Sequence, residues 1–141
     1  MDLPISTEDL TRLYRFALLL TGDENAAQQV LYDACAECAG RLGGYRNEQS
    51  RVACMLNTLR QKARGATPAG EARGIPRAFA LLPEEERAAL AGIYTGLLPA
   101  RELAEAMKIP LEQLGQTLKS ARERLSRSGM ELGEPTLETA L

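Results

Sequence analysis

The sequence predicts an all-α fold of two small helical domains joined by a flexible linker. Apolar residues recur at spacings of three and four along most of the chain, which is the period of helices buried on one side. Aromatic residues make up only 4% of the 141 residues, and tryptophan is absent. Alanine and leucine dominate instead, and this composition suits helix packing better than a β-sandwich. Residues 65–76 hold three glycines and two prolines with little apolar bulk, which predicts the linker.

These observations divide the chain into four parts. We expect a first helical domain over residues 1–64, the linker over 65–76, a second helical domain over 77–128 and a disordered tail over 129–141. Neither domain has enough apolar residues for a large core. The two domains are therefore expected to dock on each other or on a partner.

Three helices are expected in residues 1–64. The first begins near Ser6 or Thr7, where acidic side chains favour the positive end of a helix. The Thr-Gly-Asp of residues 21–23 ends this helix and offers a cap to the second, which stops at Gly43-Gly44. A third, weaker helix follows. Residues at helical spacing form the three buried faces: Leu10, Leu13, Tyr14, Ala17 and Leu18; then Ala27, Val30, Leu31, Ala34, Cys35 and Cys38; then Val52, Leu56, Leu59 and Ala63.

Three more helices are expected in residues 77–128. The first opens with Pro83 and the glutamates of residues 84–86, because proline suits a first turn and acidic side chains suit its dipole. A short helix over residues 100–107 follows, and residues 108–110, Lys-Ile-Pro, turn the chain into a longer helix over 111–127. This last helix carries a narrow apolar stripe of Leu111, Leu114, Leu118, Ala121 and Leu125.

The composition does not favour an enzyme. Histidine is absent, which removes the usual general base and the commonest metal ligand. Cys35 and Cys38 have the spacing of half a zinc or redox site, but the sequence has no second such pair. Because positions i and i+3 share a helix face, small buried apolar residues are the favoured interpretation of these cysteines. We expect no catalytic site, cofactor, metal or small-molecule substrate.

The charge and the hydropathy bear on partners and location. No apolar run approaches the length of a membrane span, and the N-terminus lacks the features of a signal peptide. A cytoplasmic location without a membrane partner is therefore expected. The net charge of −2 does not indicate a nucleic-acid binder, but residues 77–128 carry eight basic and seven acidic side chains. Any binding to nucleic acid must depend on local charge in this half.

A short helix, a tight turn and a longer helix with an apolar seam form a helix-turn-helix, here from Glu102 to Leu125. In such a motif the second helix lies in the major groove of DNA. Glutamine can read adenine, threonine can contact a methyl group and basic side chains can hold phosphates. The candidate DNA-binding residues are Gln113, Gln116, Thr117, Lys119, Ser120, Arg122 and Arg124. The alternative is an amphipathic helix with an ordinary solvated face, and the pattern alone favours neither.

Residues 82–125, LPEEERAALAGIYTGLLPARELAEAMKIPLEQLGQTLKSARERL, resemble the σ4 domain of bacterial extracytoplasmic-function (ECF) sigma factors. That family typically runs Leu-Pro-x-x-x-Arg, then Glu-Ile-Ala, a turn and Gly-Thr-Val-Lys-Ser-Arg-Leu. Residues 13–42, LYRFALLLTGDENAAQQVLYDACAECAGRL, are similar to the start of the family's σ2 domain, especially in Leu-Thr-Gly-Asp. The two stretches occur in the family's order. The resemblance implies a sigma factor that binds core RNA polymerase through residues 8–64 and promoter DNA through residues 100–127.

The resemblance also implies site residues in the σ2-like half. The family grips the polymerase with an Asp and a Gln-Glu pair on the second helix, and the residues at these positions are Gln29, Tyr32 and Asp33. The third helix of the family carries a basic cluster for promoter melting, which Arg60, Lys62 and Arg64 retain in part. Aromatic residues that hold flipped-out bases are missing from this helix.

The σ4-like half departs from the family in charge. Residues 112–117, Glu-Gln-Leu-Gly-Gln-Thr, stand where the family has Gly-Thr-Val-Lys-Ser-Arg, so two cations are lost and an anion is gained. Gly115 in mid-helix costs about 1 kcal/mol relative to alanine. Three functions stay open: a divergent ECF-type sigma factor, a sigma mimic that binds an anti-sigma factor or another regulator without recognising a promoter, and an unrelated helix-turn-helix regulator.

Overall fold

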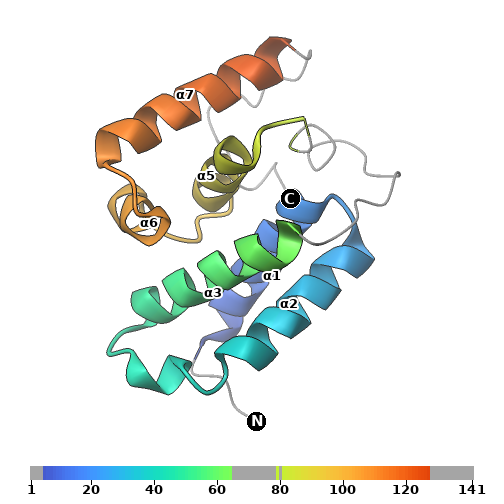
Figure 1. Cartoon of the computed structure of the whole chain (residues 1–141), viewed down its shortest axis with the longest axis vertical. Coiled ribbons are helices and arrows are strands. Elements are labelled where there is room, and N and C mark those ends of the chain that lie inside the picture. The colour runs from blue at the N-terminus through green and yellow to red at the C-terminus, as the bar shows by residue number, and fades with distance from the viewer. Residues whose placement is uncertain (1–4, 65–78, 80, 128–141) are drawn as a thin grey trace.

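The computed structural model describes residues 5–64, 79 and 81–127, and within these residues it consists of six α-helices and one short 3-10 turn. The described residues include no strand, so the predicted all-α class is confirmed. The helices form two groups, α1 to α3 and α5 to α7, which lie one above the other in Figure 1. The predicted linker, 65–76, and the predicted tail, 129–141, lie outside the described residues.

The N-terminal group is a three-helix bundle in which each helix packs against the other two. Leu13, Val30 and Leu56, one from each helix, are buried between them. The structure has the three helices predicted for residues 1–64, but the predicted end of the second helix at Gly43-Gly44 is wrong. This helix ends at Cys38, because the Arg41 N–H donates to the Cys38 carbonyl oxygen in a tighter turn, and residues 42–44 form a separate 3-10 turn. The three helices are α1 (Thr7–Thr21), α2 (Glu24–Cys38) and α3 (Glu48–Arg64), with the 3-10 turn η1 (Leu42–Gly44) between the last two.

Local signals in the sequence set the helix boundaries of this bundle. The Ser6 hydroxyl oxygen accepts a hydrogen bond from the Asp9 backbone N–H at 3.1 Å and caps α1. Gly22 ends α1 with a φ of 74°, in the left-handed region that glycine adopts without strain. The Asp23 carboxylate then caps α2 by accepting from the Ala26 N–H at 2.8 Å. The predicted start of α1 and the predicted break at residues 21–23 are confirmed.

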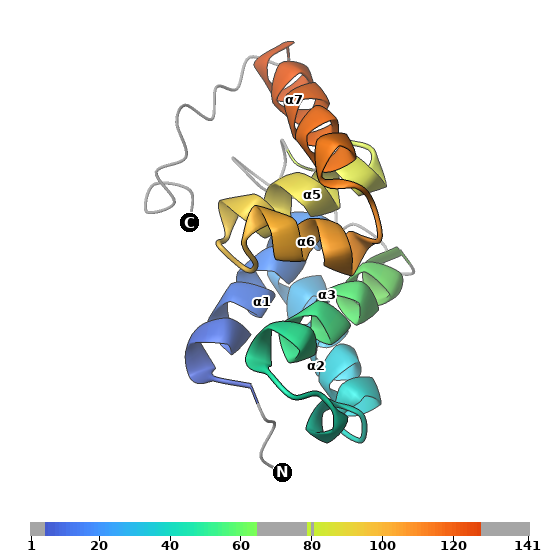
Figure 2. The same ribbon diagram turned by 90° about the vertical axis from the view of Figure 1, so that its left-hand side faces the viewer.

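The C-terminal group contains α5 (Glu84–Tyr94), α6 (Ala100–Met107) and α7 (Leu111–Arg127), as predicted for residues 84–127. In Figure 2, α7 extends away from the rest of the molecule, while α5 and α6 lie between it and the bundle. None of the helices in the described part of the chain combines the length and hydropathy needed to cross a membrane.

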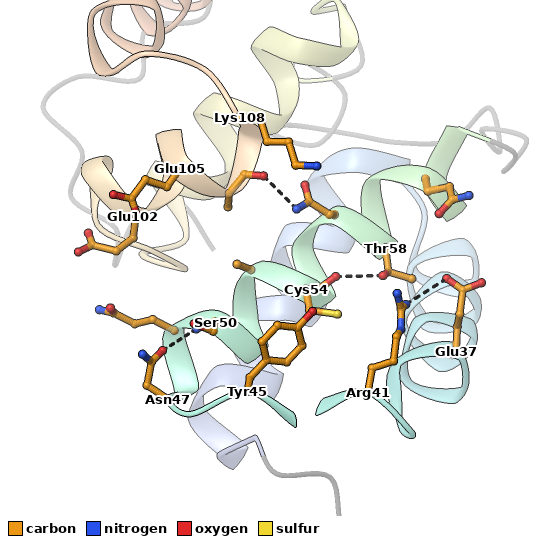
Figure 3. Close-up of a pocket in the computed structure, with 15 residues that line it drawn as sticks. Glu37, Arg41, Tyr45, Asn47, Ser50, Cys54, Thr58, Glu102, Glu105 and Lys108 are labelled. Carbon is orange, nitrogen blue, oxygen red and sulfur yellow. Dashed lines mark hydrogen bonds and ion pairs between the residues drawn. The ribbon is translucent and has the colours of Figure 1, made fainter. Parts of the chain in front are cut away.

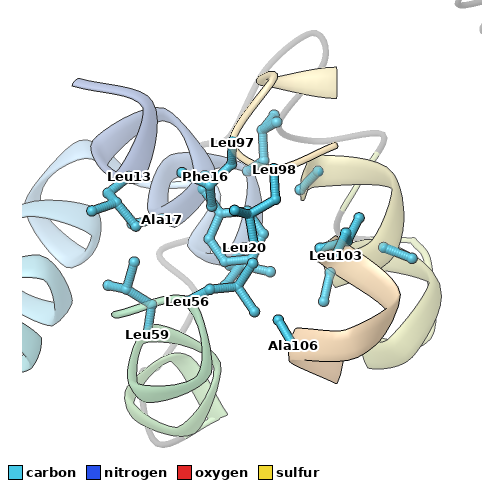
Figure 4. Close-up of a cluster of buried hydrophobic side chains, with 14 of the residues drawn as sticks. Leu13, Phe16, Ala17, Leu20, Leu56, Leu59, Leu97, Leu98, Leu103 and Ala106 are labelled. Carbon is cyan, nitrogen blue, oxygen red and sulfur yellow. The ribbon is translucent and has the colours of Figure 1, made fainter. Parts of the chain in front are cut away.

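The two groups pack against each other, α1 against α5 and α3 against α6. Phe16 and Leu20 of the N-terminal group face Leu98 and Leu103 of the C-terminal group across a common buried cluster (Figure 4). Burying a leucine-sized side chain stabilises a fold by about 1.5–3 kcal/mol, so an interface of several such residues holds the groups together. Of the two expected arrangements for these small cores, the structure has the halves docked on each other.

Candidate functional site

A turn of three residues, 108–110, connects α6 to α7. Lys108 ends α6 with φ 60° and ψ 42°, which is a left-handed conformation at a non-glycine residue. The following N–H, of Ile109, donates to the Ala104 carbonyl oxygen at 3.0 Å, so the turn satisfies the open end of α6. Pro110 precedes α7 and fixes the backbone for its first turn. The segment therefore has the short helix, tight turn and long helix that the sequence predicts.

α7 buries a narrow seam of side chains and exposes two flanks on either side of it. The seam is Leu114, Leu118, Ala121 and Leu125. The predicted stripe also included Leu111, and this part of the prediction is wrong: Leu111 opens the first turn of α7 and is 50% exposed. We call the side that faces α5 the inner flank, and it comprises Gln113, Thr117, Ser120 and Arg124. We call the opposite side the outer flank, and it comprises Gly115, Lys119 and Arg122. The predicted DNA-binding residues are thus divided between two surfaces, with Gln116 beside the inner flank.

The inner flank lies against the acidic first turn of α5, which we call the acidic turn (Glu84, Glu85 and Glu86). Gln113 Nε2 donates to Glu85 Oε1 at 3.3 Å, and Arg124 Nε donates to both Glu86 carboxylate oxygens at 3.0 and 3.1 Å. A shallow cavity of about 280 Å³ lies between the two helices and is lined by Pro83, Glu85, Glu86, Gln113, Gln116, Thr117 and Ser120. A DNA phosphate at this flank would meet carboxylates.

The outer flank carries two cations one helical turn apart. Lys119 and Arg122 are exposed, and neither forms an ion pair or a hydrogen bond with another residue within 5–64 and 81–127. Side chains at i and i+3 lie side by side on a helix surface, so both charges can reach one anionic surface. Of the predicted DNA-binding residues, these two are the cations whose charge is not matched by a carboxylate of the described chain.

Two arginines from the end of α3 hold Glu84. Arg60 donates from Nε and Nη2 to its two carboxylate oxygens at 3.0 and 2.9 Å, and Arg64 donates from Nη2 at 3.0 Å. Burial raises the pKa of Glu84, but hydrogen bonds and positive charge from the two arginines outweigh it and leave the pKa below its ordinary value. This ion-pair cluster joins the N-terminal group to the C-terminal group.

The three cations predicted for promoter melting are all paired in this arrangement. Arg60 and Arg64 contact Glu84, and Lys62 donates to Glu37 of α2 at 3.1 Å. The sequence pattern identified the cations but not these carboxylates, which lie 20 to 25 residues away along the chain.

The residues predicted to bind polymerase lie together on an outer surface of α2. Gln29 Nε2 donates to Asp33 Oδ1 at 3.0 Å, one helical turn away. Tyr32 lies beside this pair with 70% of its surface exposed, the largest fraction of any large hydrophobic residue in the described chain. Tyrosine is enriched at protein interfaces because it combines a large apolar area with a polar end. This surface is suited to a protein partner.

Sequence reasoning did not identify Arg87, although it is the Arg of the Leu-Pro-x-x-x-Arg pattern. Its guanidinium donates to three backbone carbonyl oxygens: Phe79 at 3.0 Å, Leu82 at 2.8 Å and Leu20 of α1 at 3.2 Å. Burial lowers the pKa of Arg87, and the charge of Glu84 opposes this effect. Arg87 therefore holds the start of α5 to the end of α1 and positions the acidic turn.

The acidic turn has a larger role than the helix-start electrostatics that the sequence predicts. Glu84 binds α3, while Glu85 and Glu86 bind α7. The three carboxylates thus contact cations and amides from both groups of helices. Within the described residues, no cluster of three or more histidine, cysteine, aspartate or glutamate side chains could hold a metal ion.

A scan of the sequence against models of known protein families finds no match, and a search of curated proteins finds none either. The assignment of a function therefore depends on the geometry of the α6–α7 segment, the acidic turn and the α2 surface.

Proposed function

We propose that this chain is a divergent ECF-type sigma factor, a cytoplasmic transcription-initiation protein that binds promoter DNA and core RNA polymerase. The observation that carries this proposal is the outer flank of α7, where Lys119 and Arg122 are exposed without an internal partner. A helix braced by a shorter helix can lie in a major groove while such cations hold phosphates. The resemblance of residues 82–125 to σ4 agrees with this use of the segment.

In this proposal the N-terminal helices form a σ2-like domain and the C-terminal helices a σ4-like domain, connected by the linker over residues 65–76. Core polymerase binds the α2 surface at Gln29, Tyr32 and Asp33. Arg60 and Arg64 can place their guanidinium groups on promoter DNA only after these groups leave Glu84. In this proposal the two domains separate when the σ2-like domain engages DNA. The docked arrangement is then the form of the protein away from polymerase.

The sigma mimic is the second candidate, and the internal ion pairs favour it. The inner flank faces the acidic turn, and Arg60, Lys62 and Arg64 each pair with a carboxylate. A mimic needs a folded, sigma-like surface but no exposed cations, because its partner is an anti-sigma factor. This candidate uses the Tyr32 surface and leaves promoter DNA unbound.

Transcription with purified components tests the proposal. The chain is added to core RNA polymerase with fragments of genomic DNA, and complex formation is followed by gel filtration while new transcript starts are mapped. We expect a stable complex and discrete new starts. Tyr32→Ala should weaken the complex, whereas Leu81→Ala, which removes another highly exposed side chain (66%) far from α2 in sequence, should not.

The result that overturns the sigma-factor proposal is an absence of both complex and transcripts at low salt. Binding of a small helical anti-sigma protein under the same conditions, without a shift of labelled DNA, would then establish the mimic.

A further inference from the structure

Two cysteines from different helices meet beside a groove that the proposed function does not use. Cys38 ends α2 and Cys54 lies within α3, and their Sγ atoms are 3.7 Å apart. The groove lies between the α3 region and α6 and has a volume of about 670 Å³. Figure 3 shows Cys54 at its wall beside Tyr45, with Thr58 one turn further along α3. The pair comes from tertiary packing and not from the Cys35-x-x-Cys38 spacing.

The two sulfurs differ in their access to solvent. Cys54 is half-buried and lines the groove, so a small molecule in the groove can reach it. Cys38 is fully buried, at 0% exposure, behind it. Cys35 is also half-buried but does not line the groove, and the structure gives it no hydrogen bond to Cys54. A reaction that begins in the groove therefore begins at Cys54.

Two polar side chains contact the Cys38 sulfur. The Cys38 thiol donates to the Thr58 hydroxyl at 3.2 Å, and Arg41 Nη2 lies 3.6 Å from the same sulfur. Burial raises the pKa of Cys38, the neighbouring Cys54 thiol raises it further, and the charge of Arg41 opposes both effects. The Arg41 guanidinium places a positive charge beside this sulfur, which stabilises the thiolate when the proton leaves.

We propose that Cys54 and Cys38 form a dithiol site that is oxidised by hydroperoxides to an intramolecular disulfide. The Cys54 thiol gives up its proton, the thiolate attacks one peroxide oxygen and the O–O bond breaks. Cys54 becomes a sulfenic acid, and the leaving hydroxide (or alkoxide) takes up that proton as water (or alcohol). The Cys38 thiolate then attacks Cys54 Sγ, the S–O bond breaks, and hydroxide leaves with the thiol proton as water. Two electrons pass from the two sulfurs to the peroxide, and a small-molecule thiol restores the reduced pair.

The chemistry requires the two sulfurs to approach each other. The Sγ–Sγ separation must shorten from 3.7 Å to about 2.05 Å. Cys54 adjoins the open groove and not a closed core. The disulfide would join the end of α2 to the middle of α3. This proposal is independent of the proposed function, since its chemistry involves neither DNA nor polymerase.

Peptide mapping after treatment with hydrogen peroxide tests the site. The reduced full chain is exposed to peroxide, its remaining thiols are alkylated, and trypsin then releases peptide 16–41, with Cys35 and Cys38, and peptide 52–60, with Cys54. We expect a disulfide to join these two peptides, so that the mass of the product is two hydrogens lower than the sum of the two reduced peptides. The join should persist in Cys35→Ser, the matched control, and disappear in Cys38→Ser.

Trapping of the intermediate separates the two roles. In Cys38→Ser, and equally in Cys38→Ala should the serine variant fail to fold, dimedone should label Cys54, because the sulfenic acid has no resolving thiol. In Cys54→Ser, Cys38 should stay unlabelled because it is buried. Oxidation of the wild-type chain in denaturant should remove the preference for the Cys38–Cys54 pair.

Three outcomes would overturn the proposal. Peptides 16–41 and 52–60 that stay separate in the oxidised wild type would exclude the disulfide. A bond within peptide 16–41 would assign the reaction to Cys35 and Cys38, and a join that survives Cys38→Ser and Cys38→Ala would assign it to Cys35 and Cys54.

Discussion

Arg124 and Arg122 lie two residues apart on α7 and have different surroundings. Arg124, on the inner flank, donates to both carboxylate oxygens of Glu86, whereas Arg122, on the outer flank, has no such partner within the described chain. The difference arises because the acidic turn of α5 lies beside one flank only. A cation on an exposed helix face is therefore available to a ligand only where no neighbouring helix supplies the counter-charge.

The largest effect is expected from charge reversal on the outer flank. Lys119→Glu together with Arg122→Glu removes two phosphate contacts and adds two repulsive charges, so DNA affinity at low salt should fall by about 100-fold or more. Fluorescence anisotropy with labelled duplex DNA measures this change. Arg15→Glu with Arg46→Glu is the matched control, because both residues are exposed and lie far from α7 in the sequence.

Equal DNA affinity in the wild type and the Lys119 and Arg122 double variant would remove the outer flank from consideration as the contact surface. The distinction between the two flanks would then have no consequence for DNA binding.

The next effect concerns the residue that positions the acidic turn. Arg87→Met leaves three backbone carbonyls without their charged donor, so the free energy of unfolding should fall by about 3 kcal/mol. Urea denaturation measures this loss of unfolding free energy, and Arg101→Met, on the exposed side of α6, is the control. A loss no greater than that of the control would show that the acidic turn is held in place by other contacts.

Glu84 makes stability depend on pH. Glu84→Gln should lower the free energy of unfolding by about 1 kcal/mol at pH 7, the upper value for a pair that solvent partly screens. Because the folded-state pKa of Glu84 is lowered, this contribution is present above the unfolded pKa of about 4.3 and disappears as the pH falls through the folded pKa. Denaturation curves from pH 7 down to pH 3 should therefore converge for the two proteins, and a constant gap would contradict the ion pairs.

The smallest effect is expected for the inner-flank pair. Arg124 and Glu86 have side chains that are 52% and 13% exposed, so their coupling should be only about 0.5 kcal/mol. A double-mutant cycle with Arg124→Ala and Glu86→Gln measures it. Since Arg124 is occupied by Glu86, Arg124→Ala should change DNA affinity much less than Arg122→Ala, and equal losses would contradict the division of α7 into two flanks.

Helix boundaries and buried faces could be predicted from the sequence because their causes are local. Ser6 and Asp23 cap helices through backbone atoms three residues away, and helical spacing predicts four of the five residues assigned to the stripe of α7. The fifth, Leu111, is exposed because no helix of the described chain covers the first turn at that point. Pairings between distant segments could not be predicted in this way. Arg60 meets Glu84 across 24 residues, and Cys54 meets Cys38 across 16, because of how the helices pack.

The candidate DNA-binding set shows the same limit within one helix. Gln113 and Lys119 both occupy exposed positions of the predicted helix, and nothing in their spacing distinguishes them. Only the position of α5 places Glu85 beside Gln113 and leaves Lys119 facing outward.

The salt dependence of DNA binding tests the central claim most directly. Each phosphate contact contributes a slope of about −0.9 to the logarithm of affinity against the logarithm of salt concentration. Replacing Lys119 and Arg122 by alanine should therefore reduce the slope by about 1.8, whereas Arg124→Ala should leave it nearly unchanged. A slope that stays the same without Lys119 and Arg122, or that falls equally without Arg124, would contradict the assignment of the outer flank as the DNA-binding surface.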